Sequence, residues 1–359
     1  MKVGLFLHRY FPFGGQQRDF LGVAQALIAC GHIPEIFVRD TTDPIPLPDG
    51  IPIHPIHCGA WSNAGRAKQF SRKASSLADR LGVDVRLGFV KMQELNFYFC
   101  ADPCLKAKVS PWKGLLPRYR TYLELEAETF RREGNTRYFA LSQEQVDEYA
   151  ENYGVDRRRF EVLLPNLHPS LQNGSSDREA GLRLLFVGSD FRRKGLDRLL
   201  AACACVDVHQ STVQPEVIIV GKGDVPSDLC ENVEKCGWKI RAVGPQLDVR
   251  PFYATSRVLI HPARSEPGGL VLLEAMSQGL PVVATDVCGY ARFVREANAG
   301  WVLSEPKVTT SLPKVLQELV SSPSILVEKG AQALSYVHEK DFFSSHQHIA
   351  QTLLQGHSV

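Results

Sequence analysis

Two glutamates eight positions apart are the residues best placed for chemistry in this sequence of 359 residues. Glu266 and Glu274 are separated by Pro267-Gly268-Gly269 and an apolar run, EPGGLVLLE. The glycines suit a tight loop leading into a helix over 270–277, whose first N–H groups attract an anion such as a diphosphate. Glu274 then lies about one turn inside the helix, within reach of ribose hydroxyls, and Glu266 is free to contact a sugar. An ordinary loop and helix with solvated carboxylates fits the same spacing.

A basic turn supplies the opposite charge. The segment 188–195, GSDFRRKG, follows an apolar run and precedes another helix start. Arg193 offers a planar fork to phosphate oxygens, and Lys194 adds a compact charge. Such cations stabilise a departing diphosphate without a metal ion. A solvated basic turn is the alternative, since Arg192, Arg193 and Lys194 need not all face one site.

Other glycines follow apolar runs but lack the dinucleotide pattern. Gly14-Gly15 precedes a helical segment that contains Asp19, and Gly221-Lys222-Gly223 and Gly244 follow later runs. None has the G-x-G-x-x-G spacing, which disfavours an NAD-dependent oxidoreductase. The nine cysteines are scattered and have no partner pair at zinc spacing, so no metal site is expected.

Short β-rich runs alternate with longer amphipathic segments along the chain, a pattern typical of α/β proteins. The runs expected to form buried strands are 3–7, 35–38, 83–89, 138–141, 182–187, 216–220, 240–243, 258–261, 281–284 and 301–303. A helix is expected over 16–29. Ligands of such doubly wound sheets bind beyond the carboxyl ends of the strands, where the residues above lie.

The length fits two domains. Residues 165–180, rich in Pro, Asn, Ser and Gly, form the expected hinge. We therefore expect a first Rossmann-like domain over 1–165, a second over 166–341, and a last amphipathic helix over 342–359 that packs back on the first domain. The formal net charge of +2 does not indicate a nucleic-acid partner, and no apolar stretch is long enough to cross a bilayer.

At the level of whole motifs the sequence resembles a known family. The E-x7-E segment 266–274, the string GLPV at 279–282 and the Arg193-Lys194 pair together resemble family 4 of the retaining glycosyltransferases. The strings YFPFGG at 10–15, QRDF at 17–20, GSDF at 188–191 and VCGYA at 287–291 resemble, within it, the bacterial lipopolysaccharide core α-1,3-glucosyltransferases that build the outer core. The resemblance implies a GT-B fold, an α/β architecture of two doubly wound, Rossmann-like domains facing an interdomain cleft. The domain over 1–165 would bind the acceptor, and the domain over 166–341 would bind the nucleotide sugar.

The resemblance also implies roles for individual residues. Arg193 and Lys194 would hold the diphosphate of a UDP-sugar, Glu274 the ribose, and Glu266 the donor hexose. Asp102 would lie beside the reacting anomeric carbon, where family members often have His. The remaining expected contacts of the nucleotide sugar are Gly15, Asp19, Gly188, Gly244, Gly268, Gly269 and Leu270. No metal or other cofactor is implied, because UDP-sugar is a co-substrate.

The implied reaction is transfer of a hexose, with glucose as first candidate, from a UDP-hexose donor to an inner-core heptose of lipopolysaccharide. The leaving phosphate would accept the acceptor's proton, with retention at the anomeric carbon. Pro267-Gly268 stands where relatives have two alanines, and the loop 41–59 differs, so a UDP-N-acetylhexosamine donor or another glycan or lipid acceptor remains an alternative. A non-catalytic sugar-nucleotide-binding protein is the second alternative.

Residues 106–132 indicate a location. Lysines and arginines there are interleaved with Trp112, Leu115, Leu116, Tyr119 and Tyr122. Basic and aromatic residues together suit an anionic membrane surface, although a solvated helical insertion is the alternative. With the implied lipid-linked acceptor, we expect a cytoplasmic enzyme that is peripheral on the cytoplasmic face of the inner membrane.

Overall fold

The computed structural model describes residues 1–11, 15–41, 44–172, 174, 181–266 and 268–356. The chain forms two compact units. Unit 1 comprises Met1–Asn166 and Ser344–Val359, and unit 2 comprises Leu167–Phe343. The expected breaks were 165/166 and 341/342. Residues 173 and 175–180 of the expected hinge, together with Phe13-Gly14 and Pro267, lie outside the described residues.

Unit 1 contains a seven-stranded parallel sheet in the order β3-β2-β1-β4-β5-β6-β7. Its strands are β1 (Val3–Tyr10), β2 (Glu35–Thr41), β3 (Ile53–Pro55), β4 (Val85–Gly88), β5 (Phe97–Phe99), β6 (Arg137–Ala140) and β7 (Phe160–Val162). The strands β3, β5 and β7 were not predicted. Each has only three residues, which is too short for a periodic pattern to stand out.

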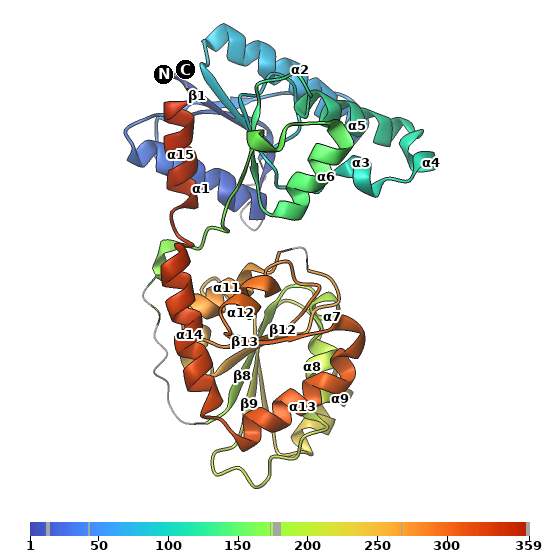
Figure 1. Ribbon diagram of the computed structural model, residues 1–359, viewed down its shortest axis with the longest axis vertical. Coiled ribbons are helices and arrows are strands. Elements are labelled where there is room, and N and C mark those ends of the chain that lie inside the picture. Colours follow the sequence, from blue (N-terminus) through green and yellow to red (C-terminus); the bar gives the residue numbers. More distant parts are fainter. Residues whose placement is uncertain (12–14, 42–43, 173, 175–180, 267, 357–359) are drawn as a thin grey trace. The chain divides into compact units, whose positions relative to one another are not determined.

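Alternate residues of β1 pack on opposite faces of this sheet. Leu5 and Leu7 join the core that includes Phe20 and Ile349, whereas Phe6 joins the core that includes Phe70. Figure 1 shows α15 beside α1 on one face. The helices of unit 1 are α1 (Gly15–Ala29), α2 (Asn63–Leu81), α3 (Leu105–Lys108), α4 (Pro111–Gly114), α5 (Pro117–Thr129), α6 (Gln143–Tyr153) and α15 (Ser345–Gln355).

Unit 2 contains a six-stranded parallel sheet in the order β10-β9-β8-β11-β12-β13. The strands are β8 (Arg183–Gly188), β9 (Glu216–Gly221), β10 (Lys239–Gly244), β11 (Val258–His261), β12 (Val282–Thr285) and β13 (Gly300–Leu303). Each of the six overlaps a predicted strand. Most apolar residues of β8, β9, β11 and β12 are buried because helices cover both faces of the sheet, whereas the edge strands β10 and β13 are mostly partly exposed.

The helices of unit 2 are α7 (Phe191–Lys194), α8 (Leu196–Cys203), α9 (Ser227–Glu234), α10 (Arg250–Thr255), α11 (Leu270–Ser277), α12 (Ala291–Glu296), α13 (Val308–Ser321) and α14 (Ile325–Lys340). Figure 1 places α8, α9 and α13 on one face of the sheet and α11, α12 and α14 on the other. None of the helices within the described part of the chain combines the length and hydrophobicity needed to cross a bilayer.

Candidate functional site

The loop that carries Glu266 connects the carboxyl end of β11 to α11. Its backbone is fixed by the neighbouring loop after β12, because Gly289 N–H donates to the Glu266 carbonyl at 3.0 Å and Tyr290 N–H to the Gly268 carbonyl at 2.9 Å. Gly269 precedes the helix with φ 99°, a left-handed conformation that favours glycine. The sequence predicted a tight loop entering a helix over 270–277, and α11 has these bounds.

The basic turn lies beside this loop. Asp190 caps α7 by accepting from the Arg193 N–H at 3.1 Å, and Gly195 ends it with φ 84°. A Cβ at Gly195 would lie 2.1 Å from the Pro262 carbonyl oxygen, so only glycine lets α7 approach the end of β11 this closely. The backbone N–H of Arg264 completes the contact by donating to the Arg193 carbonyl at 2.9 Å.

The charged groups from these two segments meet directly. The Lys194 ammonium is ion-paired with the Glu266 carboxylate. The Arg193 guanidinium lies 3.5 Å from the same carboxylate and donates to the Ser265 carbonyl at 2.9 Å. The side chains of Lys194 and Glu266 are only 13% and 11% exposed. Burial, with a smaller contribution from Arg193, lowers the pKa of Lys194 to about 8.

His261, at the end of β11, is a further member of this cluster that the sequence did not single out. The residue is fully buried, and neither ring nitrogen has a hydrogen-bond partner among the described residues. Its Nε2 lies 3.7 Å from a Glu266 carboxylate oxygen. Burial, together with Lys194 and Arg193, lowers the pKa of His261 to about 3. A neutral ring with open hydrogen-bonding positions therefore borders Glu266. Its place at the end of the predicted strand, just before Glu266, was the available signal.

Glu274 also has a partner that no sequence pattern indicated. The Tyr253 hydroxyl donates to a Glu274 carboxylate oxygen at 2.8 Å. Tyr253 comes from α10 and is 1% exposed, and burial beside this carboxylate raises its pKa well above 10. A hydroxyl that stays protonated fixes one carboxylate oxygen of Glu274, so the other can accept from a ligand.

The other predicted residues of unit 2 differ in whether they contact the charged cluster of Arg193, Lys194 and Glu266. Gly188 ends β8 beside Lys194, since a Cβ there would lie 3.0 Å from Lys194 Cγ. Gly268, Gly269 and Leu270 form the entrance to α11. Gly244 ends β10 with φ 71°, and a Cβ on it would meet no atom within 4 Å. The structure thus joins Gly188 to the charged cluster but records no contact that joins Gly244 to it.

The predicted residues of unit 1 do not form one cluster. Gly15 is the first residue of α1, and a Cβ there would meet no atom within 4 Å. The Asp19 carboxylate lies 3.1 Å from His346 Nε2 of α15, so it contacts the C-terminal helix. Asp102 follows β5 and lines a cavity of 470 Å³ with His8, Arg9 and Arg118. Of these three residues, Asp102 is thus the one that lines the 470 Å³ cavity among the described residues.

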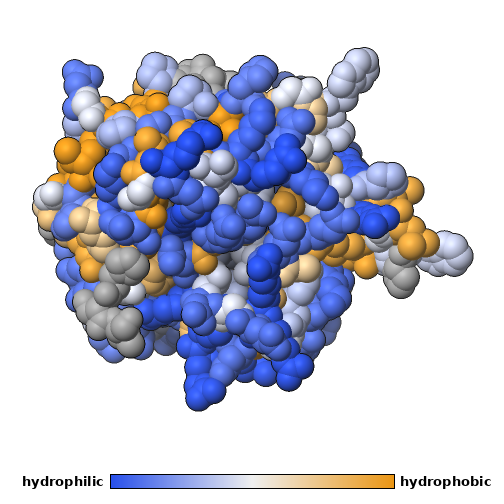
Figure 2. Space-filling view, turned by 90° about the horizontal axis from the view of Figure 1, so that it is seen from above, coloured by the Kyte–Doolittle hydropathy of each residue, from blue (hydrophilic) through white to orange (hydrophobic). Residues whose placement is uncertain are grey.

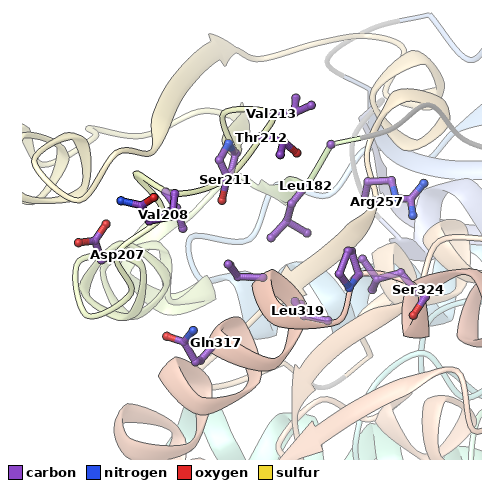
Figure 3. A pocket seen from close by; sticks show the side chains of 16 residues that line it. Leu182, Asp207, Val208, Ser211, Thr212, Val213, Arg257, Gln317, Leu319 and Ser324 are labelled. Carbon is purple, nitrogen blue, oxygen red and sulfur yellow. The ribbon is translucent and has the colours of Figure 1, made fainter.

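A larger cavity of 660 Å³ lies elsewhere in unit 2 (Figure 3). Leu182, Pro215 and Arg257, which line it, immediately precede β8, β9 and β11. This cavity is therefore at the amino ends of the strands, opposite to Glu266 and Lys194. It contains none of the predicted site residues. Within the described ranges no three His, Cys, Asp or Glu side chains gather as metal ligands.

Two parallel sheets with a charged site at strand ends place this chain among two-domain Rossmann-like proteins. The sequence pattern of the family "Glycosyl transferases group 1" matches residues 172–333. The lipopolysaccharide glucosyltransferase WaaG of Escherichia coli K12 is 31% identical over 99% of both chains. A crystal structure of WaaG matches 98% of this chain and 99% of its own, with a TM-score of 0.79 and 30% identity. HepE of Anabaena, in complex with UDP and glucose, is similar in fold, with a TM-score of 0.68 and 16% identity over 99% of this chain and all of its own.

This chain belongs to the group 1 glycosyl transferases. The resemblance stated from the sequence motifs is confirmed, and so is the fold class, with two Rossmann-like domains as in the WaaG structure. The glycosyltransferase activity class follows from the same relationship.

Proposed function

We propose that this chain transfers a hexose, with glucose as first candidate, from a UDP-sugar to an inner-core heptose of lipopolysaccharide. The relationship to a lipopolysaccharide glucosyltransferase over nearly the whole chain supports the acceptor class. The observation that carries the donor assignment is the meeting of Arg193, Lys194 and Glu266 at the carboxyl ends of β8 and β11.

The donor assignment follows from the charges of this cluster. A diphosphate is a stronger partner for Lys194 and Arg193 than one carboxylate, because it presents more negative charge and more acceptor oxygens. Its binding therefore separates Lys194 from Glu266 and leaves the carboxylate free to accept from hexose hydroxyls. The neutral His261 ring offers a second polar group on the same side. Glu274, held by Tyr253, accepts from the ribose.

The reaction is a substitution at the anomeric carbon with retention. The developing charge on the leaving diphosphate is stabilised by Arg193 and Lys194, which are fixed by α7 and by the Ser265 carbonyl. In the front-face route, the leaving phosphate oxygen accepts the proton of the attacking hydroxyl. The protein then acts by positioning and charge stabilisation, without a metal ion.

Membrane contact forms the second part of the proposal. Trp112, Leu115 and Leu116, on and just after α4, are 83%, 76% and 52% exposed. Figure 2 shows hydrophobic surface at the projecting right-hand edge, the side on which Figure 1 places α3 and α4. Lysines and arginines surround these residues in sequence. Such a tip suits an anionic membrane surface, and we place the enzyme on the cytoplasmic face of the inner membrane.

The deciding experiment assays purified protein with UDP-glucose, UDP-galactose and UDP-N-acetylglucosamine on truncated lipopolysaccharide that ends in heptose. We expect transfer to be fastest from UDP-glucose. Lys194→Ala and Glu266→Ala should each lower kcat/KM by about 100-fold or more, the magnitude typical of lost charge stabilisation in a transition state. Arg192→Ala is the matched control, because this exposed neighbour contributes only its backbone carbonyl to the described contacts.

Faster transfer from UDP-N-acetylglucosamine than from UDP-glucose would show that N-acetylglucosamine is the sugar transferred. UDP binding without transfer from any donor would support the alternative of a non-catalytic binding protein. Unchanged turnover in Lys194→Ala or Glu266→Ala, with circular dichroism showing a native fold, would refute the site.

A further inference from the structure

The cavity of unit 1 that contains Asp102 has an unusual balance of charge. It has a volume of 470 Å³, and its walls come from the end of β1, the first turn of α1, the segments after β4 and β5, and α5. Three cationic side chains line it, Arg9, Lys91 and Arg118, against the single carboxylate of Asp102.

Among the described residues, only one of these three cations has an ion-pair partner. The Lys91 ammonium is ion-paired with Glu126, which is fully buried. Leu105 N–H and Tyr153 hydroxyl also donate to this carboxylate, at 2.9 and 2.7 Å, so its oxygens are occupied. Glu126 therefore fixes Lys91 and the start of α3, and it has no capacity left for another cation.

Arg9 and Arg118 are exposed, and neither has an ion-pair partner in the described part of the chain. Arg118 lies over the ring of Tyr119, with its guanidinium carbon 5.9 Å from the ring centre. Arginine presents its donors in a fork that matches the oxygens of a carboxylate or phosphate. The two guanidinium groups on this cavity have no ion-pair partner among the described residues, and the cavity has a single exposed carboxylate. This excess of positive charge indicates an anionic ligand.

The same walls carry groups suited to hydroxyls. The Nδ1 atom of His8 is buried and has no hydrogen-bond partner among the residues described. Burial, with a contribution from Arg39, lowers the pKa of His8 to about 4, so the ring is neutral at pH 7. The backbone of Asp102 is held by Tyr149, whose hydroxyl donates to its carbonyl at 3.0 Å. The Asp102 carboxylate makes no hydrogen bond within the described chain and is free to accept.

We propose that this cavity binds a sugar that bears an acidic substituent, either a carboxylate or a phosphate ester. Hydroxyls of the sugar meet His8 and Asp102, and its apolar face packs on Tyr119 and Tyr122. The acidic group pairs with Arg9 and Arg118. This inference rests on the proposed function in one respect, that the sugar belongs to the acceptor of the transfer reaction.

The test measures binding in the absence of donor, so that it does not depend on turnover. Isothermal titration calorimetry compares three heptose-bearing oligosaccharides, one with a carboxylate, one with a phosphate and one neutral. We expect at least one acidic form to bind about tenfold or more tightly than the neutral form, and the form that does so identifies the substituent. Arg118→Gln and Arg9→Gln should remove most of that preference and leave the affinity for the neutral form unchanged.

Arg120→Gln serves as the matched control. Arg120 lies two residues further along α5, pairs with Glu124 at 3.2 Å and does not line the cavity. It should keep the wild-type preference. Equal affinity for acidic and neutral sugars, or full preference retained in Arg118→Gln, would overturn the inference. Binding with this preference but without transfer from any UDP-sugar would refute the proposed function and support the cavity's assignment.

Discussion

Replacing Tyr253 with phenylalanine isolates the contribution of one hydroxyl to nucleotide binding. The ring remains to fill its buried position, and the 2.8 Å hydrogen bond to Glu274 is lost. We expect this bond to persist when a ligand binds, so its full strength does not appear in the affinity. The loss is instead the cost of immobilising the Glu274 side chain on binding, about 0.5–1.5 kcal/mol. The expected weakening of UDP affinity is therefore about 2- to 12-fold.

The assay is calorimetric titration of UDP into wild type and Tyr253→Phe, repeated with 2′,3′-dideoxyuridine diphosphate. Because the dideoxy nucleotide offers no ribose hydroxyl to Glu274, the two proteins should bind it equally. With a UDP-sugar, KM should rise while kcat stays within about twofold, since the change is remote from the reacting carbon. An equal loss for both nucleotides would show that Tyr253 acts through general packing, and no loss for UDP would refute the ribose assignment of Glu274.

Four further predictions concern charge and surface. Lys194→Met and Glu266→Gln should each lower the free energy of unfolding by about 2 kcal/mol, because each leaves one poorly solvated charge without its partner. In urea titrations the double variant should lose about 1–2 kcal/mol less than the sum of the two single losses. Strictly additive losses would contradict the ion pair. The pKa of Lys194 is lowered to about 8, so its positive charge is lost as pH rises through 8. Between about pH 7 and 8, where the UDP phosphates are fully ionised, UDP affinity should be nearly constant, and it should fall by up to about tenfold per pH unit above 8. The Lys194→Arg variant should show no such fall. Transfer should persist in excess EDTA, because Arg193 and Lys194 stabilise the charge of the leaving diphosphate. A complete loss of transfer that Mg²⁺ restores would show that these two residues are not sufficient for that stabilisation. Trp112→Glu with Leu116→Glu should reduce sedimentation with anionic vesicles without changing the affinity for UDP, and unchanged sedimentation would exclude this tip as the membrane contact.

The strands of unit 2 could be predicted because each contains a short apolar run, which in β8, β9, β11 and β12 is largely buried between helices on both faces of the sheet. Strands of three residues could not, because so short a run shows no period, whether it is fully buried like β5 or partly exposed like β3 and β7. The same limit applies to helix ends, which depend on particular side chains such as the Ser62 cap of α2.

Local spacing located the parts of the site but not their partners. Glu266 and Lys194 were each expected at the end of a strand, and parallel pairing of β8 with β11 brings those ends together. Contacts between unrelated helices leave no periodic trace, so the hydroxyl of Tyr253 on Glu274 was missed. For Asp19, the family resemblance implied a contact with the nucleotide sugar. The contact that the structure shows is with His346, which is 327 residues away in the sequence.

The return of the chain to unit 1 has a consequence for how the protein is made. Unit 2 is one continuous segment, whereas unit 1 needs Ile349, Ala350 and Leu353 of α15 to complete its core. The ribosome makes the chain from the N-terminus, so unit 1 is the first unit to be started and the last to be completed. Unit 2 can close while unit 1 still exposes the surface of α1 that α15 later covers. A released chain that ends before Ser345 would carry all of unit 2 and a first unit whose α1 surface is uncovered, which makes it a substrate for chaperones.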